Sequence, residues 1–147
     1  MTRVVHYLNQ FFVGQGGEDA AGSPPNRIPG PVGPGRRLQQ LLGDDFEIVA
    51  TVHCGDDDAS GRPDAIGEIL ALAAEEHPDL LLIGPAFTSG RYGLACARLA
   101  AAAADAGIPA LAAMHPENPG LEEAGSAPVV ASGRQAREMG PSLEALA

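Results

Sequence analysis

Apolar and polar positions along the chain follow two different periods. Short apolar or β-branched runs, which are typical of buried strands, occupy residues 3–8, 46–53, 79–83, 109–114 and 128–131. Between them, helical spacing is clearest in 64–76, where Ile66, Ile69, Leu70 and Ala73 stand at i, i+3, i+4 and i+7. Further helices are predicted at 35–42, at 91–106 and, disturbed by Pro141, at 134–146.

Strands that alternate with helices predict right-handed crossovers and a mainly parallel sheet, and apolar strands fit a sheet covered on both faces. We therefore expect one α/β domain over 1–147, a flavodoxin-like doubly wound fold with a mainly parallel five-stranded sheet and helices on both faces. A Rossmann-type strand order is the alternative. The connections are a long Gly/Pro-rich loop at about 9–34, an exit loop at 54–58 and a flexible-looking spacer at 121–127.

Composition excludes several classes. A net charge of −10 argues against a nucleic-acid binder, which needs a basic face. No apolar run is long enough to span a membrane and no signal peptide is visible, so the cytoplasm is the expected location. Two cysteines are too few for a disulfide scaffold, and the four histidines show no zinc-site spacing. Neither a metal nor a cofactor bound to this chain is expected.

Residues 84–93, GPAFTSGRYG, lie between a predicted strand and a predicted helix. The first turn of a helix has unpaired N–H groups and favours negative charge, and Arg91 adds a guanidinium suited to a carboxylate or phosphate. This order predicts an anion site. The alternative is a plain turn in which Gly and Pro only set the backbone geometry.

In an open α/β sheet, ligands bind beyond the carboxyl ends of the strands. The five predicted exit loops begin at Asn9, Cys54, Gly84, His115 and Ser132 and must converge at that edge. The candidate substrate-binding residues are Asn9, Gln10, Asp56, Phe87, Thr88, Ser89, Arg91, Tyr92, Met114, Glu117 and Asn118. The glycines of 14–17 match neither the dinucleotide fingerprint nor a P-loop, because the required helix and Lys are missing.

Cys54 is the candidate catalytic residue, because it ends a strand at the expected ligand edge. A reactive thiolate needs a cation or a helix N-terminus to lower its pKa. Otherwise Cys54 is a small residue packed at the rim of the site. Cys96 is expected in the core, and His6 is expected to be a buried histidine with satisfied hydrogen bonds.

Several segments together resemble a known family. They are VHYLNQFF at 5–12 with GGE at 16–18, GPG at 33–35, VATV at 49–52 with CGD at 54–56, GPAF at 84–87 with GRYG at 90–93 and AC at 95–96, and Met114 with ENPG at 117–120. In order and spacing the chain resembles the N-terminal portion of the selenoprotein B component of glycine, sarcosine and betaine reductases.

The resemblance implies reductive cleavage of the Cα–N bond of a small amino acid or its N-methyl derivative. In that family a selenol or thiol takes up the carboxymethyl group, and component B works with a pyruvoyl-containing protein. The family's redox-active selenocysteine or cysteine lies in a C-terminal part that this chain lacks. The resemblance thus implies a substrate-binding subunit of a heteromeric enzyme whose nucleophile lies on a partner chain, unless the chain is a truncated product.

The chain departs from the family at three places on the expected ligand edge. His53 replaces an apolar residue, Thr88-Ser89 replaces Asn-Ala, and Ala112-Ala113 replaces a Thr-Gly-like pair. Glycine or betaine is therefore not assumed as the substrate. Two alternatives stay open: a non-catalytic module that binds a small anion or supports a partner, and a thiol enzyme with redox or C–S bond-forming chemistry at Cys54.

Overall fold

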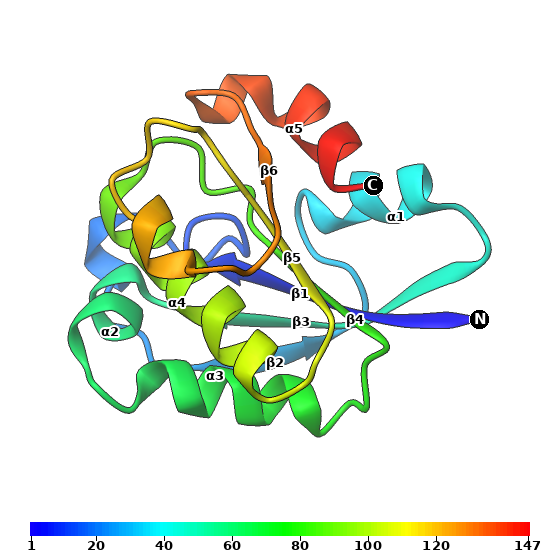
Figure 1. Cartoon of the computed structure of the whole chain (residues 1–147), viewed down its shortest axis with the longest axis horizontal. Helices are drawn as coiled ribbons and strands as arrows, with labels where there is room; N and C mark the ends of the chain where they lie inside the picture. The colour runs from blue at the N-terminus through cyan, green and yellow to red at the C-terminus, as the bar shows by residue number, and fades with distance from the viewer.

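The computed structural model describes residues 1–147 as a six-stranded sheet with helices on both faces (Figure 1). The strands are β1 (Thr2–Asn9), β2 (Asn26–Pro29), β3 (Phe46–Cys54), β4 (Leu80–Ile83), β5 (Ala110–Met114) and β6 (Val129–Ala131). The α-helices are α1 (Gly35–Leu42), α2 (Asp56–Gly61), α3 (Ala65–Ala74), α4 (Gly90–Asp105) and α5 (Met139–Leu146). Short 3₁₀ helices are η1 (Glu18–Ala20), η2 (Leu121–Ala124) and η3 (Ala136–Glu138).

The sheet is mixed, and its strand order is β2-β3-β1-β4-β5-β6. The prediction of five strands is wrong, because β2 forms inside the expected long loop and pairs antiparallel with β3. Ile28 is the one apolar side chain of β2, and the strand ends at Pro29. Such a strand is tolerated at an edge, where one side of its backbone needs no partner, and it leaves almost no periodic signal. The flavodoxin-like arrangement stays a prediction.

The two faces of the sheet carry cores of different size. Helices α2, α3 and α4 cover one face, where 20 buried residues form the main core. Helices α1 and α5 cover the other face, where seven buried residues, among them Leu38 and Leu143, form a smaller core. The two layers are visible on opposite sides of the strands in Figure 1. Alternate residues of β1 supply both cores, since Val4 belongs to the smaller one and Val5 to the larger.

Three segments differ from what the sequence predicts. The loop expected at 54–58 is largely helix α2, whose first turn holds three aspartates that suit the positive end of a helix. The expected spacer at 121–127 contains η2. The C-terminal helix is divided into η3 and α5. Pro141 lies in the first turn of α5, where a missing N–H breaks no intrahelical bond.

Strand β1 lies between β3 and β4, both parallel to it. The chain therefore leaves β1 toward one side of the sheet and later returns to its other side through β4. This reversal is a topological switch point, and the loops that follow β1 and β4 diverge there and leave a crevice. None of the helices has the length and apolarity needed to cross a membrane.

Candidate functional site

A hollow of about 310 Å³ lies at the carboxyl ends of β1 and β4, and we call it the carboxyl-edge pocket. It is lined by Asn9, Phe11, Phe12, Ala86, Phe87, Thr88, Ser89, Tyr92, Arg134, Gln135 and Ala136. These residues come from the loops after β1, β4 and β6 and from the first turn of α4. The pocket therefore lies at the switch point, where the topology predicts a ligand site.

Aromatic side chains form one wall of the pocket. The ring of Phe12 lies 5.3 Å from Phe11, 6.1 Å from Phe87 and 6.0 Å from Tyr92 between centroids. These separations are within the range of favourable aromatic pairs. Phe11 is 58% exposed, whereas Phe87 and Tyr92 are buried. The wall thus combines packed, largely buried rings with one exposed ring at the rim.

The buried amide of Asn118 fixes the loop between β4 and α4. Its Nδ2 donates to the carbonyl oxygens of Phe87 at 2.9 Å and Ser89 at 3.1 Å, and its Oδ1 accepts from the Gly120 N–H at 2.8 Å. A Cβ atom at Gly93 would lie 2.2 Å from this amide, so only glycine leaves room for it. Asn118 therefore ties the exit loops of β4 and β5 together behind the pocket.

Two arginines near the pocket differ in their surroundings. Arg134 lines the pocket, is 57% exposed at its side chain and pairs with Glu117 at 2.6 Å between Nη2 and Oε2. The Thr88 hydroxyl donates to the Arg134 carbonyl at 2.9 Å. Arg91 does not line the pocket and pairs with both Glu18 and Asp57. Arg134 is thus the cation that belongs to the pocket, and the sequence-based hypothesis that Arg91 holds an anion stays a prediction.

The first turn of α4 faces the same pocket, because Ser89 and Tyr92 both line it. Ser89 is the N-cap residue and makes no side-chain capping bond. The first N–H groups of a helix have no intrahelical partner and attract negative charge. This helix end and Arg134 therefore both border the pocket.

Asn9, Gln10 and Asp56 form a buried hydrogen-bonded group beneath the pocket. The Asn9 Nδ2 donates to Asp56 Oδ2 at 3.1 Å, and the Asp56 N–H donates to Gln10 Oε1 at 3.0 Å. Burial raises the pKa of Asp56 above its usual value, and the Asn9 bond and the Arg91 charge oppose that rise. The group fixes the start of α2 against the exit of β1.

Cys54 is fully buried at the end of β3 and lies outside the pocket lining. Burial, followed by the neighbouring Asp58 carboxylate, raises the pKa of the Cys54 thiol to about 12. Its Sγ lies 3.5 Å from Asp58 Oδ2. Burial likewise raises the pKa of Cys96. The thiolate that catalysis by Cys54 requires is thus disfavoured in this environment.

Two histidines are buried in the sheet. The Nε2 of His6 bonds the Gly84 carbonyl at 2.7 Å, whereas its Nδ1 has no protein partner. The prediction of a buried histidine is confirmed, but only one of its ring nitrogens is satisfied. Burial lowers the pKa of His6 to about 4 and lowers that of His53 as well. No group of three His, Cys, Asp or Glu side chains is arranged to hold a metal ion.

The structure brings most of the sequence-predicted residues to one place. Asn9, Phe87, Thr88, Ser89 and Tyr92 line the pocket. Gln10, Asp56 and Asn118 support it from behind, and Glu117 reaches it through Arg134. Met114 is buried in the main core. Sequence reasoning missed Phe11, Phe12, Arg134 and Gln135, although Arg134 follows the predicted exit loop at Ser132 and a convergence argument could have found it.

A model of the glycine/sarcosine/betaine reductase selenoprotein B family matches residues 1–147. The chain belongs to this family. It is 48% identical over 99% of its length to the "Glycine reductase complex component B subunit gamma" of Symbiobacterium thermophilum, covering 34% of that protein. It is 48% identical over 82% of its length to the "Sarcosine reductase complex component B subunit beta" of Peptoclostridium acidaminophilum, covering 28% of that protein.

A more distant member, the "Betaine reductase complex component B subunit beta" of Peptoclostridium acidaminophilum, is 36% identical over 83% of the chain and is covered to 28%. The chain thus spans about a third of the length of these selenoprotein B relatives. No solved structure matches it. The family resemblance expected from the sequence is confirmed.

Proposed function

We propose that residues 1–147 form the substrate-binding part of a glycine/sarcosine/betaine reductase-like component B. The carboxyl-edge pocket would then bind a small amino acid or its N-methyl derivative. The observation that carries the proposal is the position of this pocket at the switch point, with a helix N-terminus, an arginine and an aromatic wall around it. Membership of the selenoprotein B family supports the substrate class.

The substrate carboxylate would lie between Arg134 and the first turn of α4. A guanidinium binds a carboxylate by paired charged hydrogen bonds, and the helix end adds unpaired N–H donors. For this, Arg134 must exchange its bond with Glu117 for one with the ligand. The aromatic rings of Phe12, Phe87 and Tyr92 would face the ammonium or N-methyl end, which aromatic faces attract.

We further propose that the nucleophile comes from a partner chain in a hetero-oligomeric complex. Cys54 and Cys96 are buried, and their thiols have raised pKa values, so neither suits covalent chemistry at the pocket. The selenol or thiol, and the pyruvoyl group expected from the family, would then be supplied outside these residues. Division of labour of this kind lets a preorganised pocket orient the substrate for an incoming nucleophile.

Binding of glycine, sarcosine and betaine to the chain, followed by NMR and calorimetry, tests the first proposal. The expected result is amide shifts confined to the loops after β1, β4 and β6. Arg134→Gln should weaken binding by roughly 10- to 100-fold, the range of a charged hydrogen bond. Arg137→Gln is the matched control, since Arg137 carries the same charge three residues later outside the pocket. Equal losses of affinity in both variants would show that the effect comes from net charge and not from a contact of Arg134 with the ligand.

A non-catalytic scaffold role predicts a different outcome. In that case none of the three compounds binds at millimolar concentration, and shifts on adding a partner chain cover a broad surface rather than the pocket. A result of that kind would refute the proposed substrate site.

A further inference from the structure

Three buried polar atoms behind the carboxyl-edge pocket have no protein hydrogen-bond partner. They are the hydroxyls of Tyr7 and Tyr92 and the Oδ1 of Asp56. Tyr7 and Tyr92 are at most 1% exposed, and Asp56 is 6% exposed. We call these three residues the buried polar cluster.

The cluster is assembled from three elements on one face of the sheet. Tyr7 lies in β1 two residues before Asn9, so both point to the α4 side, and Asp56 begins α2. The rings of Tyr7 and Tyr92 lie 6.2 Å apart between centroids. Asn9 connects Asp56 with Tyr92: its Nδ2 donates to Asp56 Oδ2 at 3.1 Å, and its backbone lies close to the Tyr92 hydroxyl.

Nearby protein groups do not satisfy these atoms. The Asn9 backbone and the Cys96 thiol lie close to the Tyr92 hydroxyl, but neither makes a well-formed hydrogen bond with it. The other Asp56 oxygen is already bonded to Asn9. A buried polar atom without a partner is costly, and native structures almost always satisfy such atoms with protein or with ordered water.

The chemistry of the three atoms selects the occupant. Two phenol hydroxyls can donate, and the carboxylate can only accept while it is ionised. A water molecule accepts two hydrogen bonds and donates two, so it can accept from both tyrosines and donate to Asp56. An anion is excluded because it would face the carboxylate. We propose that Tyr7, Tyr92 and Asp56 enclose a structural water site that joins the Asp56 carboxyl to the wall of the pocket.

The consequence concerns the pocket without depending on its ligand. Tyr92, a member of the buried polar cluster, lines the pocket, and so does Asn9, which bonds Asp56. The water would therefore hold the pocket wall against α2. The Asp56 carboxyl then lies one side chain behind the ligand-facing surface. The water site stands or falls separately from the proposed substrate, because its test needs no ligand.

Direct observation is the first test. A crystal structure of the 147-residue chain at about 1.5 Å should show density within hydrogen-bond distance of both tyrosine hydroxyls and Asp56 Oδ1. Absence of density there, while other buried waters are resolved, would overturn the proposal.

The Tyr92→Phe variant tests the same site in solution by the sign of two changes. With a bridging water, loss of the hydroxyl should lower Tm and raise the Asp56 pKa by roughly half a unit or more, measured by carboxyl carbon NMR. Without the water, the variant removes an unsatisfied hydroxyl, so Tm should rise or stay constant and the pKa should not change. The latter pair of results would contradict the proposal.

The groups that face Asp56 must be held constant in this comparison. Arg91 and Glu18 act on the Asp56 carboxyl, and its charge in turn acts on Cys96 and on both tyrosines. Thr51→Val is the control, because it removes a buried hydroxyl that is paired with the Gly30 carbonyl at 2.8 Å on β3. It should lower Tm without moving the Asp56 pKa.

The strongest competing occupant is an ammonium ion, which could donate to the carboxylate and to both phenol oxygens. Ammonium chloride should stabilise the chain no more than sodium chloride at equal ionic strength if water is the occupant. A rise in Tm specific to ammonium, lost in Tyr92→Phe, would replace the water with a cation and overturn the proposal.

Discussion

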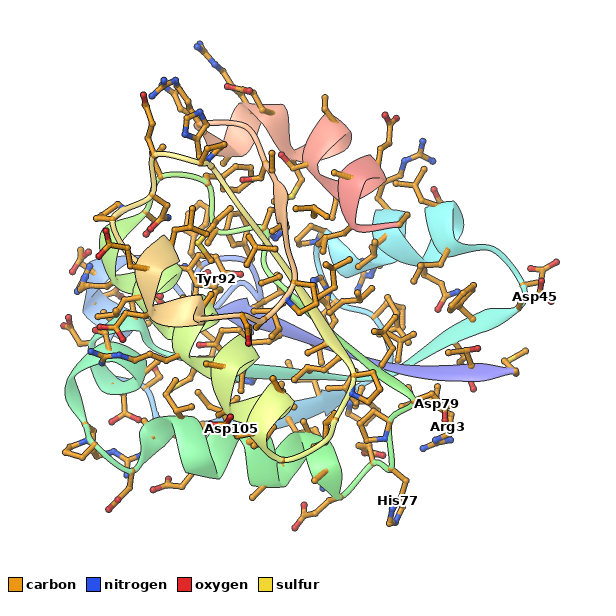
Figure 2. The ribbon with its side chains drawn as sticks, in the orientation of Figure 1. Arg3, Asp45, His77, Asp79, Tyr92 and Asp105 are labelled. Atoms are coloured by element: carbon orange, nitrogen blue, oxygen red, sulfur yellow. The ribbon has the colours of Figure 1, made fainter.

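The hollows at the two ends of the sheet differ in volume and in the chemistry of the residues around them. The larger hollow, about 850 Å³, lies at the amino-terminal end and is lined by surface residues such as Arg3, Glu47 and Glu76. Figure 2 shows Arg3 and Asp79 at this end, with Tyr92 toward the other. The carboxyl end holds the smaller pocket, which lies at the switch point, is bordered by packed aromatic rings and is backed by the buried side chains of Asn118 and Asp56. Topology and buried chemistry, rather than volume, therefore identify the candidate site.

Each end carries an amide side chain that holds the backbone of two segments together. At the amino end, the Gln39 Nε2 donates to the Phe46 carbonyl at 2.8 Å, and its Oε1 accepts from the Ile48 N–H at 2.7 Å. Asn118 does the same at the carboxyl end but is almost fully buried. This pair provides a control for separating stability from binding.

The largest expected effect is that of Asn118→Ala. It leaves the buried Gly120 N–H without its acceptor and removes one donor from the Phe87 and Ser89 carbonyls, so we expect the free energy of unfolding to fall by about 2–4 kcal/mol. Gln39→Ala should cost less, about 1–2 kcal/mol, because Gln39 is only half-buried. Urea denaturation measures both.

The same two variants divide the ends by ligand affinity. Asn118→Ala should abolish measurable binding at the pocket, whereas Gln39→Ala should leave Kd unchanged. Equal losses of affinity at equal loss of stability would show that the comparison between the two ends is wrong.

Stability should depend on pH through the buried histidines. Because the pKa of His6 falls from 6.5 to about 4 on folding, the unfolded chain binds a proton more readily between these values. The contribution of His6 to the free energy of unfolding is fully present above pH 6.5, and it should fall by about 3 kcal/mol as the pH drops to 4. His53 acts in the same direction, and Asp56, whose pKa is raised, acts in the opposite one.

Urea unfolding at pH values from 7.5 down to 4.5 measures this slope. Asp58 and Glu68, whose pKa values are lowered, contribute mainly below this range. His6→Gln should flatten the profile. A profile that keeps its full slope in this variant would remove His6 as its source.

Arg91→Ala should have a smaller effect on binding than Arg134→Gln. Arg91 already pairs with Glu18 and Asp57 on the surface, where such pairs contribute 0 to about 1 kcal/mol. We expect a change in Kd of at most about threefold by calorimetry. A loss approaching 100-fold would instead confirm the sequence-based hypothesis that Arg91 holds the carboxylate.

The smallest expected effect on binding is that of Cys54→Ala, which should leave Kd unchanged because Cys54 lies outside the pocket lining. The reactivity of the Cys54 thiol gives a second measurement. The raised pKa of Cys54 leaves almost no thiolate at pH 8, so iodoacetamide should modify the native chain far more slowly than the chain in urea. Mass spectrometry follows the modification. Rapid native labelling of Cys54 would restore the thiol-enzyme alternative.

The elements that the sequence predicted are those with strong periodicity. The apolar run at 79–83 and the i, i+3, i+4 pattern around Ile69 predicted β4 and α3 within one or two residues of their ends. Strand β2 escaped because its pairing with β3 is a tertiary contact and Ile28 alone gives no pattern. Helix α2 escaped because its aspartates suit a turn as well as a helix start.

The candidate site followed a similar division. Convergence of exit loops predicted Asn9, Phe87 and Tyr92 at the pocket, because strand direction fixes which loops meet. It could not show that Arg91 is paired with Glu18 and Asp57, since those contacts join residues far apart in sequence. It could not show either that burial and the Asp58 carboxylate outweigh the Arg62 charge at the Cys54 thiol.

The amide of Asn118 makes one backbone position a remote sensor of the pocket. It bonds the Phe87 and Ser89 carbonyls through Nδ2 and the Gly120 N–H through Oδ1. A ligand that steadies the β4 loop must also slow the opening of the bond to Gly120, although Gly120 itself does not line the pocket. Hydrogen exchange at that single amide would then register occupancy from behind the wall.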